Sequence, residues 1–182
     1  ALTLAILGHP GKGKEAINGF QSLTFLQPRF WLAHFLLCRA YKEMGEPDCA
    51  AEAYSEDIRI DPLNALLFDR RAEAYDILGT RGLALDDHDT AVVLSPNDSS
   101  YHVRRGIALF SMGRLDEAIQ DLDQAINSYE ESINYEVVSR RNLDEAAKFE
   151  PRLARAYNNR GAAYYQLGRI ERAIEDYDRA IQ

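Results

Sequence analysis

Apolar side chains recur at steps of three and four residues along most of the chain. In residues 31–44 they share one face of a predicted helix, at Leu32, Phe35, Leu36, Ala40 and Tyr41. A second helix is predicted from about Pro47 to Ile60, and Asp61-Pro62 ends it because the residue before a proline avoids helical geometry. No stretch alternates with period two over the length of a strand. The pattern therefore predicts an all-α protein of helix–turn–helix units.

This unit repeats with a period of 34 residues. Proline and alanine keep the same spacing as glycine, and one step of 55 residues in each series exceeds the period by 21. The glycine series is Gly11, Gly45, Gly79, Gly113 and Gly168. A glycine ends the first helix of a unit because it adopts the left-handed conformation of the turn without strain. Self-similarity at this period indicates a stacked array in which each unit packs on its neighbours.

Within one period, the order small residue, Tyr, Gly, Ala, aromatic and Pro resembles the tetratricopeptide repeat. In the first complete unit these residues are Cys38, Tyr41, Gly45, Ala50, Tyr54 and Pro62. The resemblance implies an all-α, right-handed superhelix (solenoid) of stacked antiparallel helix pairs. We expect one array over 1–182: a truncated repeat at 1–30, repeats at 31–64, 65–98 and 99–132, a helical insertion at 133–153, and a repeat at 154–182.

An insertion in the last part of the chain distinguishes this array from a regular one. Pro151 follows Ala125 by 26 positions, where Pro96 follows Ala91 by five. The apolar stripe of the preceding helix continues through Ile126, Tyr129 and Ile133, which predicts an overlong helix to about Val137 or Val138. Asn142 followed by Glu145 predicts a capped, returning helix to about Phe149. The insertion is either a tolerated extension at the outer edge or a helical projection that contacts a partner or a neighbouring copy.

Charge and composition exclude several classes of function. A net charge of −8 over 182 residues opposes general nucleic-acid binding. The chain also has no run of 18 apolar residues that could span a membrane. The two cysteines, Cys38 and Cys49, have no metal-type spacing, and their scarcity favours a cytoplasmic, reducing compartment. Packing positions account for most of the histidines, and no phosphate-binding loop is present. We expect no enzymatic activity, no cofactor and no metal.

The resemblance also implies where a partner would bind. In this family the first helix of each repeat lines a concave groove, and the corresponding peptide-binding candidates here are Phe35, Arg39, Lys42, Arg70, Arg104, Phe110, Arg155, Asn158 and Tyr165. Arginine offers paired hydrogen bonds to carboxylates, and aromatic rings provide apolar anchors. We therefore expect a non-catalytic protein–protein interaction scaffold for an extended or helical segment with a carboxylate and an apolar anchor. In the other interpretation, some of these arginines pair with neighbouring Asp69, Glu73 or Asp76.

Three further hypotheses compete with this one. A clamp for the acidic tails of heat-shock chaperones is disfavoured, because only Arg104 matches among the five corresponding positions Phe35, Arg39, Arg70, Ser100 and Arg104. Since the chain begins and ends inside repeats, we expect it to be part of a longer protein, and it would then serve as an accessory region of a larger enzyme. Apolar surface at the ends of the array, or the insertion, would alternatively make it a self-assembling homo-oligomer.

Overall fold

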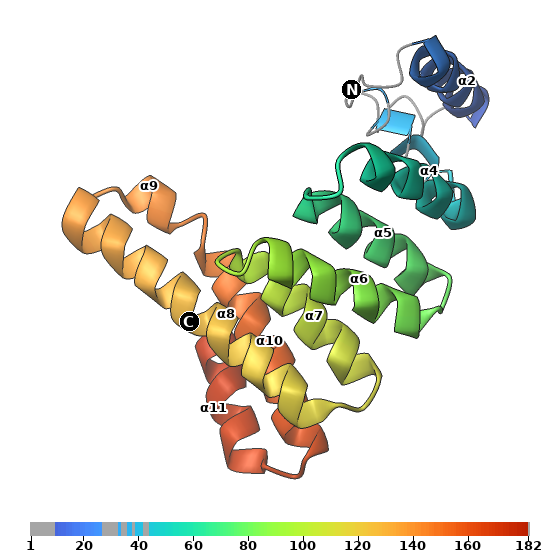
Figure 1. The fold of residues 1–182 in the computed structure, drawn as a ribbon. Helices are drawn as coiled ribbons and strands as arrows, with labels where there is room; N and C mark the ends of the chain where they lie inside the picture. Colours follow the sequence, from blue (N-terminus) through green and yellow to red (C-terminus); the bar gives the residue numbers. More distant parts are fainter. Residues whose placement is uncertain (1–9, 27–32, 34–35, 38, 42–43, 182) are drawn as a thin grey trace. The chain divides into compact units, whose positions relative to one another are not determined.

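Helices account for all regular secondary structure in the computed structural model, which describes residues 10–26, 33, 36–37, 39–41 and 44–181 (Figure 1). The predicted all-α fold is thereby confirmed for these residues. The chain divides into two compact units, Ala1–Leu94 and Ser95–Gln182.

The first unit contains α2 (Pro10–Leu26), α4 (Pro47–Ile60), α5 (Ala65–Ile77) and α6 (Arg81–Leu94). Helix α5 packs between α4 and α6, and Tyr54, Leu67 and Ala74 are buried together in the core where α4 meets α5. Pro47 begins α4, where its missing N–H costs nothing. The side chain of Asn64 caps α5 by accepting a hydrogen bond from the Leu66 amide.

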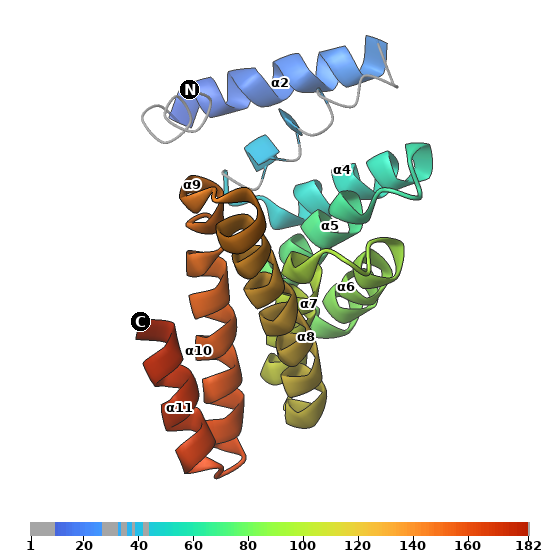
Figure 2. The same cartoon turned by 90° about the vertical axis from the view of Figure 1, so that its left-hand side faces the viewer.

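The second unit contains α7 (Ser99–Ser111), α8 (Leu115–Asn134), the π-helical segment η1 (Tyr135–Arg140), α9 (Leu143–Ala146), α10 (Glu150–Gln166) and α11 (Ile170–Ile181). Helices α10 and α11 form an antiparallel pair, with α8 along the other side of α10 (Figure 2). Leu122 and Ile126 of α8 and Ala156 and Tyr157 of α10 form the buried core between these helices.

Two kinds of glycine position make the tight helix pairs possible. The turn glycines Gly45, Gly79, Gly113 and Gly168 have φ of 73° to 75°, which confirms the predicted left-handed turns. Gly161 permits close approach within a pair, because a Cβ there would lie 3.2 Å from the Ala173 carbonyl oxygen of α11.

The insertion follows the expected course with two differences. The overlong helix α8 continues as η1 to Arg140, and Arg141 then turns the chain with φ of 52°. Asn142 caps α9 by accepting from the Glu145 amide at 3.2 Å, the contact expected from the capping pattern. However, α9 ends at Ala146 instead of about Phe149, and α10 begins at Glu150, before the expected start of the last repeat. Pro151 accounts for the second difference, because proline fits the first turn of a helix and here stands in the first turn of α10.

Candidate functional site

The predicted groove residues are distributed over both units. Phe35 and Lys42 lie outside the described residues. In the first unit, Arg39 is exposed, and Arg70 donates to Glu73 Oε1 at 2.6 Å, one of the pairings that the second interpretation of the arginines expects. The other five candidates belong to the second unit, on α7 and α10.

A cavity of about 310 Å³ in the second unit brings two of the predicted residues together. Arg104 of α7 and Arg155 of α10 both line it, and Ser100 and Val103 contribute a polar edge and an apolar wall. Its remaining lining residues are Asp98, Tyr129 and Arg152. Three of the seven lining side chains are therefore guanidinium groups, in a protein whose net charge is −8.

Tyr129 is held at this cavity by the insertion. Its side chain is buried in the α8–α10 core, and its ring centroid lies 6.4 Å from that of Phe149, which precedes α10. Burial raises the pKa of the Tyr129 phenol, with a further contribution from Asp98, although Arg152, Arg104 and Arg155 act in the opposite direction. The hydroxyl therefore stays protonated at neutral pH and can donate a hydrogen bond.

Asp98 is the one acidic residue among the cavity's lining side chains, and it also caps α7. Its Oδ1 accepts from the Ser100 amide at 2.9 Å and from Ser100 Oγ at 2.6 Å. A carboxylate at a helix N-terminus compensates the positive end of the helix dipole. Its charge is thus partly engaged by α7 itself.

The other three predicted groove residues lie outside this cavity. Phe110 packs against the buried cluster that includes Ile119 and Tyr164, so it contributes to the core of the second unit. Asn158 and Tyr165 are exposed on α10, and Tyr165 retains 63% of its accessible surface.

A second set of arginines, which the sequence did not predict to be paired, has a structural role. Each makes two hydrogen bonds of 2.6 to 2.8 Å to an aspartate sixteen residues later, on the second helix of the same repeat. These repeat ion pairs are Arg71–Asp87, Arg105–Asp121 and Arg160–Asp176. Their spacing of 34 and then 55 residues matches the glycine series, which is the signal that could have identified them.

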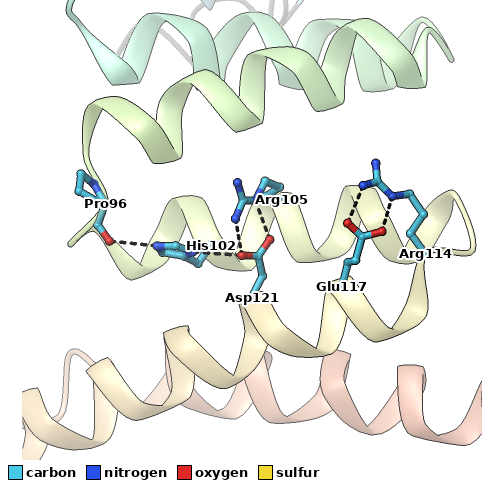
Figure 3. A network of polar contacts seen from close by, with 6 residues as sticks. All are labelled: Pro96, His102, Arg105, Arg114, Glu117 and Asp121. Atoms are coloured by element: carbon cyan, nitrogen blue, oxygen red, sulfur yellow. Dashed lines mark hydrogen bonds and ion pairs between the residues drawn. The ribbon is translucent and has the colours of Figure 1, made fainter.

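His102 extends one of these pairs. Its Nδ1 lies 3.2 Å from Asp121 Oδ1 and its Nε2 lies 3.0 Å from the Pro96 carbonyl oxygen (Figure 3). The hydrogen bond with Asp121 is the main cause that raises the pKa of His102, against the effect of burial. Burial alone would raise the pKa of Asp121, but hydrogen bonds from Arg105 and His102 outweigh it and hold that pKa below its usual value.

A second cavity, of about 580 Å³, lies beside this histidine and is lined mainly by polar side chains, Asn97, Gln124, Asn127, Ser128 and Glu131 among them. Both His102 ring nitrogens already face acceptors, so the ring is not available to a ligand there. Among the residues that the structure describes, no three His, Cys, Asp or Glu side chains come together as a metal-binding group. None of the described helices combines the length and apolar character needed to cross a bilayer.

The helix pairs, the turn glycines and the 34-residue period define a class of α-helical repeat protein. Residues 105–136 and 154–182 each match a model of the tetratricopeptide repeat. The chain is a tetratricopeptide repeat protein.

Relatives and solved structures agree with this assignment. RNA polymerase II-associated protein 3 of Homo sapiens is 28% identical over 167 residues, which cover 78% of this chain and 25% of that protein. Small glutamine-rich tetratricopeptide repeat-containing protein 2 of Mycosarcoma maydis is 32% identical over 96 residues, 52% of this chain and 27% of that protein. The chain thus matches only about a quarter of the length of these relatives.

Among solved structures, MamA superposes with a TM-score of 0.74 at 20% identity, covering 94% of this chain and 88% of MamA. YrrB, described as a TPR protein with an unusual peptide-binding site, gives a TM-score of 0.68 at 22% identity over 97% of this chain and 80% of its own. At these identities the likeness shows the fold.

Proposed function

We propose that this chain is a non-catalytic protein-interaction scaffold that binds an acidic segment of a partner protein at the cavity between α7 and α10. One observation carries the proposal: Arg104 and Arg155, from the first helices of consecutive repeats, line the same cavity. The relatives support the broad class, since RNA polymerase II-associated protein 3 is named for its association with RNA polymerase II.

The cavity has the chemistry that such a segment requires. A guanidinium group can give two parallel hydrogen bonds to a carboxylate, and it retains its charge at any physiological pH. Val103 offers an adjoining apolar surface for the neighbouring side chain of the partner. Because the chain as a whole is acidic, this local positive charge would guide an acidic segment to one place on the second unit.

Site-directed photo-crosslinking in the native source tests the proposal. A benzoylphenylalanine in place of Asn158, one turn after Arg155 on α10, should cross-link to a defined segment of a partner. The same group in place of Glu175, which is exposed on α11, provides the matched control. The cross-link from position 158 should disappear when Arg104→Ala and Arg155→Ala are combined.

The captured segment is then identified by mass spectrometry and synthesised, and its affinity is measured by calorimetry. Loss of the two arginines should weaken binding at least tenfold while the far-UV circular dichroism stays unchanged. Equal cross-linking from positions 158 and 175, or affinity that does not depend on the two arginines, would exclude this cavity as the binding site.

A further inference from the structure

We propose that the cavity at Arg104, Arg152, Arg155 and Tyr129 is a phosphate-binding site, and that the partner segment it takes is phosphorylated on serine or threonine. This inference rests on the proposed function and narrows the class of ligand. It also assigns a role to the insertion, whose Phe149 packs against Tyr129 at the site.

The charges around the cavity match a phosphate better than a carboxylate. Three guanidinium groups and a single carboxylate line it, and the carboxylate of Asp98 already accepts two hydrogen bonds from Ser100 at the start of α7. A phosphoserine carries about −1.5 to −2 charges at neutral pH and three strong acceptor oxygens, where a glutamate carries one charge and two oxygens. A phosphate can therefore be shared among three arginines.

The arginines approach from two helices. Arg152 and Arg155 are three residues apart in the first turns of α10, so both side chains can project from the same face of that helix. Arg104 reaches the same cavity from α7. At about 310 Å³, the cavity lies at the lower end of the range for small-ligand pockets, about 300 to 1,000 Å³, and suits one phosphorylated side chain.

Tyr129 adds a neutral donor. Because its phenol remains protonated at neutral pH, its hydroxyl can donate to a phosphate oxygen that the arginines leave unoccupied. The Phe149 ring and the α8–α10 core hold the tyrosine ring in place, so little side-chain freedom is lost when the ligand binds.

This combination of residues depends on the insertion and is not a general property of the repeat. The second helices α4 and α6 end at Ile60 and Leu94, which correspond by the 34-residue period to Ser128, so Tyr129 is helical only because α8 is overlong. One period before Tyr129 the chain has Ser95, and the residues that correspond to Arg152 and Arg155 are Asn97 and Ser100. Of the three arginine positions, only that of Arg104 has an arginine one repeat earlier, Arg70.

Other anionic partners suit the molecule less well. A nucleic acid or an anionic membrane presents many charges over a wide surface, and a chain with a net charge of −8 is repelled by both. A single phosphorylated side chain concentrates its charge in one cavity and leaves the rest of the protein surface free.

The test measures binding of small probes to the full chain by NMR, through the Nε–Hε signals of the arginine side chains. The probes are N-acetyl-O-phosphoserine amide, the corresponding glutamate amide and inorganic sulfate, each at constant ionic strength. The phosphoserine probe should bind at least tenfold more tightly than the glutamate probe and should shift the signals of all three cavity arginines. Its affinity should fall as the pH is lowered from 7.5 to 5.5, because the second phosphate pKa is about 6, whereas the affinity of the glutamate and sulfate probes should not.

Variants separate the cavity from general charge effects. Arg152→Ala should weaken binding of the phosphoserine probe at least tenfold. Tyr129→Phe, which keeps the ring, should weaken its binding about threefold, which corresponds to about 0.65 kcal/mol. Arg169→Ala removes one positive charge elsewhere in the second unit, where Arg169 pairs with Asp116, and should have no effect. Circular dichroism of each variant verifies that the helices remain intact.

Two outcomes overturn the inference in different ways. Equal affinity for the phosphoserine and glutamate probes, with both dependent on Arg104 and Arg155, would establish a carboxylate site, and the proposed scaffold function would survive without the phosphate. Co-sedimentation with vesicles containing phosphatidylserine, without any shift by the phosphoserine probe, would replace the phosphopeptide by a membrane surface. Failure of the cross-linking experiment, by contrast, bears on the scaffold function itself.

Discussion

Removal of one arginine from the repeat ion pairs should cost far more stability than removal of an arginine at the surface. Arg160 donates two hydrogen bonds to Asp176, which is only 4% exposed, and a third to Asp123 of α8 at 2.6 Å. Arg160→Ala leaves the Asp176 carboxylate buried without these donors. A buried ion pair broken in this way loses about 3 to 5 kcal/mol.

Arg160→Ala also removes the hydrogen bond to Asp123, so no donor from α10 replaces the lost contact to Asp176. We therefore expect the substitution to lower the free energy of unfolding of the second unit by about 3 to 5 kcal/mol.

The reverse variant, Asp176→Ala, should cost less. The Arg160 side chain is 19% exposed and keeps its hydrogen bond to Asp123, so we expect a loss of about 1 to 2 kcal/mol. Arg169→Ala is the matched control, because that arginine pairs with Asp116 at the surface, where such a pair contributes about 0.5 kcal/mol.

Urea unfolding followed by circular dichroism gives the total loss, and hydrogen exchange of the α10 and α11 amides shows where it occurs. Exchange is needed because a repeat array can open unit by unit, so a single transition cannot be assumed. A loss below about 1 kcal/mol for Arg160→Ala, or one equal to that of Arg169→Ala, would show that these pairs do not stabilise the stack as argued.

Two other predictions follow from the second unit. The pKa of His102 is raised in the folded state above its ordinary value of 6.5, so its contribution to stability is complete below pH 6.5 and is lost as the pH rises through the folded pKa. Urea unfolding of the chain should show this decline up to pH 8.5, and His102→Gln should flatten it; an unchanged slope would count against the charged form of His102. Gly161→Ala should lower stability by up to about 2 kcal/mol, because the new Cβ would lie 3.0 Å from the Tyr177 ring and 3.2 Å from the Ala173 carbonyl oxygen of α11, and this crowding, at about 1 to 3 kcal/mol, exceeds the gain of about 1 kcal/mol in helix propensity. A melting temperature unchanged by this substitution would contradict the close approach of α10 and α11.

The sequence predicts most of the fold because the 34-residue period is marked by glycines, whose role at these positions is to adopt the positive φ of a turn. Gly113 and Gly168 mark the turns with positive φ, and the helices lie between them as expected. Helix α10 begins at Glu150, before the expected start of the last repeat, because proline both ends one helix and fits the first turn of the next. Sequence alone does not decide which of these two roles a given proline takes.

The candidate site was less predictable than the fold. The positions of Arg104 and Arg155 in the repeat predict them as groove residues. Arg152 and Tyr129 lie outside the helix bounds of the other repeats, where the period no longer specifies a position. Their place at the cavity depends on the path of α8, η1 and α9 and on the packing of Tyr129 against Phe149. Such packing involves residues far apart in the sequence, which a local pattern does not contain.

The neighbouring arginines of α7 show how one repeat can serve both stability and recognition. Successive residues of a helix are rotated by about 100° around its axis, so Arg104 and Arg105 must point to different sides. Arg105 pairs with Asp121 of α8 within the repeat, and Arg104 lines the cavity that α7 shares with α10. The ion pair occupies a position that recurs in three repeats, whereas the residues around Arg104 differ from one repeat to the next. Selection for a partner can therefore change the cavity residues while the ion pairs continue to hold each helix pair together.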